Sequence, residues 1–268
     1  VSPAFGMGAG IRVFRGQRDG FVSTNDLSPS GLQLALEQAL GMLGLAPSPL
    51  GGGSFEGLKT LSDFGLHKND WLQRCPNLQE ATGTLLVGTD RLNVHGKHLQ
   101  SRRGSYSRDW QEVLVAASDG TFARDIRLHQ SVGLTVLAAD GEHRSGLGRR
   151  YGTSGRPDDL REWDADASAQ DVCSSAATML YADYVEAGQM PAVLANRFGG
   201  VIFHEACGHL LETTQVERGT TPFADKVGQP IAHEAVTAID EGLSDGAFGS
   251  LSMDDEGMEP QRTVLIEN

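Results

Sequence analysis

Positive charge is scarce in this sequence. Its 268 residues include 22 Lys and Arg against 35 Asp and Glu, which gives a formal net charge of −13. Nucleic acids and anionic membrane surfaces are bound by clustered basic side chains. The only dense basic stretch, residues 101–110 (SRRGSYSRDW), is short enough to be a solvated turn. The charge balance therefore argues against a nucleic-acid partner and against a membrane-surface partner.

Cysteine and long apolar runs are also scarce. The three cysteines, Cys75, Cys173 and Cys207, are far apart and odd in number, which argues against a disulfide framework. No apolar run approaches the length of a membrane span, and the first residues do not have the pattern of a signal peptide. We therefore expect a soluble protein with a cytoplasmic location.

The N-terminal part of the sequence predicts a hairpin and a helix. Two β-rich runs, residues 11–14 and 21–24, flank Gly-rich and charged turn residues. A helix is expected to follow, because Ser28 suits an N-cap, Pro29 suits the first helical position, and apolar residues recur at helical spacing. Residues 46–57 (APSPLGGGSFEG) are rich in Pro and Gly, which indicates a flexible connection.

The middle of the sequence predicts an antiparallel β-meander over residues 82–147. Short apolar runs such as GTLLVG, RLNVHG, EVLVAAS and SVGLTVLAA are separated by the turn signals TD, SDG and ADG. Residues 168–187 then predict one amphipathic helix that Gly188 closes, because apolar and aromatic side chains share one stripe. A further strand is expected in MPAVLAN, residues 190–196.

These patterns together predict an α+β fold with antiparallel sheets flanked by helices. We expect an N-terminal α+β domain over residues 1–187 and the start of a β-rich C-terminal domain over residues 188–268, which carries the candidate active-site helix. The sequence begins at Val1 without a methionine and stops in RTVLIEN, a strand pattern running into a turn. We therefore expect segments to be missing at both ends and the C-terminal domain to be incomplete.

One segment, FGGVIFHEACGHLLE at residues 198–212, places His204, Glu205 and His209 inside an otherwise apolar or small run. Two histidines four apart on a helix share a face, which is why His-Glu-x-x-His builds zinc sites. Here the spacing is five, which separates the side chains by about 140° on a regular helix. A π-bulge or a kink near Gly208 would bring them together, and glycine tolerates such distortion.

Two interpretations of this segment stay open on spacing alone. In the first, the histidines bind zinc and Glu205 is the general base on a water molecule. In the second, both histidines are core residues with ordinary hydrogen bonds, and Glu205 is a surface charge. Cys207 lies in the same turn and is expected to pack rather than to bind metal. The second His-Glu pair, His233 and Glu234, is expected to have a surface or strand role, and a role as a distant metal ligand stays open.

The motif and its surroundings resemble the TldD/PmbA family of metallopeptidases, proteins once described as modulators of DNA gyrase. The family's mark is His-Glu-x-x-x-His, the longer spacing found here. GIRVF and GFVSTNDLS resemble the family's N-terminal hairpin, and MPAVLANRFGGVIFHEACGHLLE resembles its active-site strand and helix. DEGLSDGAFGSLSMDDEGMEPQRTVLIEN resembles the acidic stretch and strand that follow. The resemblance covers most of the sequence and is weakest between residues 46 and 120.

The resemblance implies roles for individual residues. His204 and His209 match the family's zinc ligands, and Glu205 matches its catalytic glutamate. The third zinc ligand of the family is a downstream cysteine, which none of Cys75, Cys173 and Cys207 matches by position. The motif implies the TldD-like, catalytic side of the family, because PmbA-like (TldE) partner subunits generally lack it.

The resemblance also implies an activity and an assembly. The leading hypothesis is a zinc-dependent endopeptidase that cleaves small unstructured or modified peptides inside an enclosed cavity. The protein would act as a homodimer or as a heterodimer with a PmbA-like paralogue. The alternative is a catalytically inactive regulatory or scaffold subunit of such a complex. A regulator that acts on gyrase is a third possibility, against which the acidic charge argues.

Overall fold

The structure is a computed structural model, which describes residues 4–46, 62–64, 75–96, 98–154, 160, 163–196, 199–242 and 247–267. The chain divides into two compact units, residues 1–57 and 58–268. These units differ from the two domains expected from the sequence, residues 1–187 and 188–268, and that division stays a prediction. Of the predicted flexible connection, residues 47–57 lie outside the described residues.

The first unit consists of a hairpin and one helix, as the sequence predicts. Strands β1 (Ala9–Arg15) and β2 (Arg18–Thr24) pair antiparallel. Helix α1 (Pro29–Met42) begins where the Ser28 side chain accepts a hydrogen bond from the backbone N–H of Gly31 at 3.1 Å. The helix packs so closely on the hairpin that a Cβ at Gly20 would collide with the carbonyl oxygen of Ala39.

The second unit is built on a long antiparallel sheet. Strand β5 (Phe122–Asp140) pairs with β4 (Leu99–Ala116) on one side and with β6 (His143–Ser154) on the other, both antiparallel. The short strand β3 (Ser62–Asp63) pairs parallel with the start of β5. The α+β fold class is therefore confirmed, as are antiparallel strands over the later part of the predicted meander.

The earlier part of the predicted meander is wrong. Residues 82–95 belong to helix α3 (Leu78–His95), not to strands. Asn77 and Glu80 form a capping box at its start, with hydrogen bonds of 2.9 and 3.0 Å between each side chain and the other residue's backbone N–H. Short apolar runs do not separate helix from strand by themselves, and the cap is the signal that decides here.

The predicted helix at residues 168–187 is placed nearly correctly but is too long. Helix α4 (Ala165–Leu180) begins at the N-cap Asp164 and ends before Tyr181. The chain beyond it, including the predicted strand at residues 190–196, is irregular and exposed, with Tyr184 and Val193 essentially fully exposed. These side chains have no apolar surface to pack against, and a helical or strand pattern without packing does not hold its structure.

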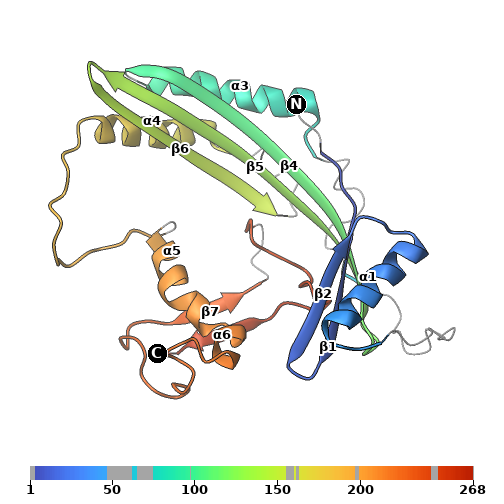
Figure 1. Ribbon diagram of the computed structural model, residues 1–268. Helices are drawn as coiled ribbons and strands as arrows, with labels where there is room; N and C mark the ends of the chain where they lie inside the picture. The colour runs from blue at the N-terminus through green and yellow to red at the C-terminus, as the bar shows by residue number, and fades with distance from the viewer. Residues whose placement is uncertain are drawn as a thin grey trace. The chain divides into compact units, whose positions relative to one another are not determined.

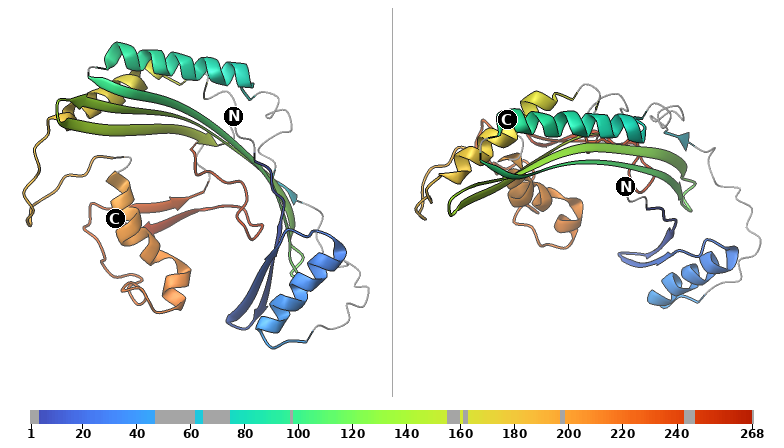
Figure 2. Two further views of the ribbon diagram at one scale, coloured as in Figure 1. Left: turned by 45° about the horizontal axis from the view of Figure 1, so that its top comes forward. Right: turned by 90° about the horizontal axis from the view of Figure 1, so that it is seen from above.

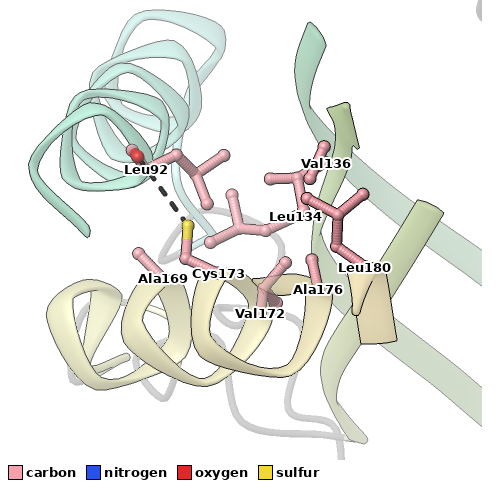
Figure 3. Close-up of a cluster of buried hydrophobic side chains, with 9 residues drawn as sticks. Leu92, Leu134, Val136, Ala169, Val172, Cys173, Ala176 and Leu180 are labelled. Atoms are coloured by element: carbon pink, nitrogen blue, oxygen red, sulfur yellow. Dashed lines mark hydrogen bonds between the residues drawn. The ribbon is translucent and has the colours of Figure 1, made fainter. Parts of the chain in front are cut away.

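Helices α3 and α4 lie on the same face of the sheet (Figures 1 and 2). Between them and the sheet is the main core, in which Leu92 of α3 and Val172 of α4 meet Leu134 and Val136 of β5, all at most 1% exposed (Figure 3). Cys173 packs in the same cluster, its thiol 3.7 Å from the Leu92 carbonyl oxygen, and burial raises the pKa of that thiol. Cys173 is therefore a packing residue, as expected.

The C-terminal part of the second unit contains another hairpin. Strands β7 (Ala238–Glu241) and β8 (Arg262–Ile266) pair antiparallel. Helices α5 (Gly200–Phe203) and α6 (Thr213–Glu217) precede this hairpin in the chain, and the candidate site lies on the irregular helical run between them. Within the described residues, no helix is both long and apolar enough to cross a lipid bilayer.

A buried polar link joins the segment between β7 and β8 to the central strand β5. Asp125 is 0% exposed and accepts a hydrogen bond from the Ser252 hydroxyl at 2.6 Å. Arg127 lies 3.5 Å from the second Asp125 oxygen and donates to the Met253 carbonyl oxygen and to Asp255, each at 2.9 Å. Because side chains alternate along a strand, this link lies on the sheet face opposite the helix-covered core.

Replacing Arg127 tests the importance of this link. We expect Arg127→Ala to lower the free energy of unfolding by about 3–5 kcal/mol, because it leaves the Asp125 carboxylate buried without its cation. Arg149→Ala is the control, since the Arg149–Asp171 pair is 43% and 50% exposed and such pairs contribute less than about 1 kcal/mol. If urea unfolding shows that both variants lose the same free energy of unfolding, the buried contact between Arg127 and Asp125 does not have this importance.

Candidate metal centre

The candidate site lies on one irregular helical run. Helix α5 (Gly200–Phe203) continues into the π-helix η3 (His204–Gly208) and then into a single 3₁₀ turn, η4 (His209–Leu211). The run ends at Glu212, whose backbone is extended, with φ −68° and ψ 138°, and helix α6 (Thr213–Glu217) follows. Figure 1 shows α5 at the start of this helical run and α6 directly after it.

The π-helix brings the two histidines together. The backbone N–H of His209 donates to the carbonyl oxygen of His204, the i→i+5 bond that defines a π-turn. The ring centroids of His204 and His209 are 4.3 Å apart, at an interplanar angle of 64°. The angular separation that a regular α-helix would impose is therefore absent, and the local widening expected from the five-residue spacing is confirmed.

Gly208, by contrast, does not adopt the distorted backbone that was expected at this position. Its backbone lies in the ordinary right-handed region, with φ −53° and ψ −55°. A Cβ at this position would meet no atom closer than His204 Nδ1, at 3.7 Å. The π-turn therefore uses backbone angles that any residue can adopt, and the glycine is not required for it.

Three side chains of this run form a potential metal-binding group. His204, Glu205 and His209 can each present a ligand atom such that all three atoms lie within 4.8 Å of one another. Across the described ranges, no other set of three or more His, Cys, Asp or Glu side chains meets this condition. Glu205 Oε2 lies 3.8 Å from His209 Nε2. Cys207 is half-buried and outside the group, in agreement with the expectation that it packs.

A fourth residue, Glu212, was not identified from the sequence. Its Oε1 lies 2.6 Å from His209 Nδ1. This hydrogen bond is the main cause that raises the pKa of His209 above its usual value; the negative charges of Glu212 and Glu205 add to the effect, and desolvation opposes it. In a continuous helix a glutamate three residues after a histidine would share its face, but the extended backbone at Glu212 is not visible in that spacing.

The second His-Glu pair lies elsewhere. His233 and Glu234 are exposed and line a cavity of about 910 Å³ together with Leu211, Phe223 and part of β8. His233 Nδ1 accepts a hydrogen bond from the backbone N–H of Ala235 at 3.1 Å. The expected surface role is confirmed, and neither side chain belongs to the metal-binding group.

The donor set fits zinc. Imidazole nitrogens are ligands that zinc accepts, and the Nε2 atom of His209 stays available because Nδ1 is engaged by Glu212. A His-Glu pair followed by a second His on the same helical run is typical of metallopeptidases. The fold and the site thus define an α+β protein with a helical run whose side chains are arranged as in a metallopeptidase motif.

Comparison with protein families agrees with this class. Residues 1–43 match domain 1 of the PmbA/TldA metallopeptidases, residues 75–180 match their central domain, and residues 187–268 match their C-terminal domain. The chain belongs to the TldD/PmbA family of metallopeptidases.

Individual relatives carry matching names. A metalloprotease TldD homologue of Buchnera aphidicola (subsp. Acyrthosiphon pisum) is 30% identical over 97% of this chain and 55% of its own length. A metalloprotease TldD homologue of Haemophilus influenzae is 28% identical over the same shares. The chain thus spans about half the length of these curated relatives.

Solved structures share the fold. A protein of Bacteroides thetaiotaomicron described as a modulator of DNA gyrase has a TM-score of 0.72 at 15% identity, over 97% of this chain and 59% of that one. TldE from Thermococcus kodakarensis has a TM-score of 0.67 at 21% identity, over 97% of this chain and 57% of that one. At these identities the likeness shows the fold alone.

The two histidines can be tested as ligands by direct metal binding. We expect His204→Ala and His209→Ala each to weaken zinc binding by more than about 100-fold, since losing a ligand should exceed the roughly 10- to 100-fold effect of losing a residue that only hydrogen-bonds to a ligand. His233→Ala, outside the group, is the control and should bind zinc as the wild type does. Chelator competition on the complete protein gives the affinities, and equal values for all three variants would remove both histidines from the site.

Proposed function

We propose that this protein is a zinc-dependent peptidase of the TldD type, in which Glu205 is the general base. The observation that carries the proposal is the π-turn at residues 204–208. It places the His204 and His209 rings 4.3 Å apart with Glu205 beside them. The membership of the chain in a metallopeptidase family supports the same conclusion.

His204 and His209 would hold the metal through their imidazole nitrogens. Catalytic zinc sites usually have three protein ligands and an open position. The resemblance implies a downstream cysteine as the third ligand, and none of the cysteines in this sequence matches it by position. When bound, zinc would polarise the scissile carbonyl and lower the pKa of the attacking water.

Glu205 would carry the proton in the reaction. Its side chain is 64% exposed, so a substrate and a water molecule can reach it, and Oε2 lies 3.8 Å from His209 Nε2. The carboxylate accepts a proton from the attacking water and then donates it to the leaving amine nitrogen of the peptide. A carboxylate adjacent in sequence to a metal-binding histidine is placed for both transfers.

The proposed substrates are small unstructured or modified peptides. This class follows from the family resemblance, as does assembly into a homodimer or a heterodimer with a PmbA-like paralogue. The name of one structural relative, TldE, is consistent with a paired assembly. The net charge of −13 gives no support to a nucleic-acid partner. A cytoplasmic location stays a prediction.

Glu205→Gln tests the catalytic role. We expect it to lower kcat/KM on unstructured peptides by about 10²–10⁴-fold, the usual contribution of a general base, while zinc content is unchanged. Glu234→Gln is the matched control, because Glu234 also follows a histidine but lies outside the metal-binding group. The measurements are peptide cleavage and zinc content of the complete protein.

Two outcomes would contradict the proposal. Equal cleavage by wild type and Glu205→Gln would exclude the general-base role. Zinc binding without any cleavage by the wild type, alone or with a PmbA-like partner, would favour the alternative of an inactive scaffold subunit.

A further inference from the structure

The two ring nitrogens of His209 have different surroundings. Nδ1 lies 2.6 Å from Oε1 of Glu212. Nε2 faces Glu205, whose Oε2 is 3.8 Å away, and the ring packs edge-on against His204. One nitrogen is therefore occupied by a carboxylate, and the other points into the proposed metal-binding group.

The backbone at Glu212 favours this contact. Glu212 stands at the N-cap position of α6, where Ser, Thr, Asp or Asn would be preferred, and its side chain makes no capping hydrogen bond. Its carbonyl oxygen instead accepts from the backbone N–H groups of Gln215 and Val216, at 2.9 and 3.2 Å. The extended backbone that ends η4 lets the carboxylate turn back onto His209 while the carbonyl begins the next helix.

We infer that Glu212 is a positioning residue that fixes the ring orientation and tautomer of His209 for metal binding. The inference rests on the proposed function. A carboxylate accepts hydrogen bonds only, so the short contact requires a proton on His209 Nδ1. In the neutral imidazole the lone pair is then on Nε2, on the side of Glu205. Metal-binding histidines are commonly held in this way by a carboxylate that accepts a hydrogen bond from the ring nitrogen that does not bind the metal.

The competing interpretation is an ordinary surface ion pair. Both side chains are about half exposed, His209 at 47% and Glu212 at 52%, and they are three residues apart on a helical run. Such pairs contribute little to stability. The two interpretations differ in what the loss of Glu212 changes: a surface pair leaves the tautomer of His209 and its zinc affinity alone, whereas a positioning residue controls both.

The experiment compares Glu212→Ala and Glu212→Gln with Glu217→Ala in the complete protein. Glu217 is the last residue of α6, five positions on, and its replacement removes the same charge from the same region. Zinc affinity is measured by competition with a chromophoric chelator. The tautomer of His209 is read in the metal-free protein from its ¹⁵N ring shifts after selective histidine labelling.

We expect Glu212→Ala to weaken zinc binding about 10- to 100-fold and to lose the dominant Nδ1–H tautomer. Glu212→Gln, whose amide oxygen can still accept from Nδ1, should recover part of both, and Glu217→Ala should behave as the wild type. Wild-type affinity and tautomer in Glu212→Ala would overturn the inference and leave the proposed function intact. If the wild type binds no zinc, the proposed function fails, and the tautomer in the metal-free protein still decides the inference.

Discussion

The geometry of the candidate site depends on one backbone hydrogen bond, from the N–H of His209 to the carbonyl oxygen of His204. A regular α-helix would direct these two side chains away from each other, since five residues correspond to about 140° around its axis. The wider π-turn removes this separation over a single turn, and the 3₁₀ turn that follows ends the run at Glu212. Without that turn, the motif would be two unrelated histidines on a short surface helix.

The helical run lies next to the β7–β8 hairpin, which is linked in turn to the long sheet. The β7–β8 hairpin lies beside its end, where Leu211 and β8 line a common cavity. The segment between β7 and β8 is joined to β5 by Asp125, Arg127 and Ser252, and Leu251 donates a backbone hydrogen bond to Gly242, next to β7, at 2.9 Å. Helices α3 and α4 cover one face of the sheet that contains β5. Polar contacts connect the other face to the hairpin near the site.

Capping residues and turn signals in the sequence correctly predicted helix α1 and the first hairpin. Ser28 and Pro29 marked the start of α1, and the two β-rich runs on either side of a turn marked the first hairpin. The strands predicted within residues 83–96 were wrong because the capping box of Asn77 and Glu80 starts a helix there, and short apolar runs fit a helix as well as a strand. The end of α4 depended on packing, which the sequence pattern does not contain.

The sequence predicted which residues make up the candidate site, but only part of its backbone geometry. His204, Glu205 and His209 stand out by residue type, and their spacing demanded a distortion, which the structure has. The contribution of Glu212 depends on the backbone break that follows η4, which spacing alone does not reveal. The role expected for Gly208 was wrong because a π-turn needs no unusual backbone angles.

X-ray absorption at the zinc edge of the complete wild-type protein tests whether His204 and His209 bind one zinc ion. We expect a bound zinc that is coordinated by two imidazole nitrogens at about 2.0–2.1 Å, both lost together when the motif histidines are replaced. A zinc shell with no imidazole contribution, or no zinc at all after the protein is supplied with the ion, would contradict it.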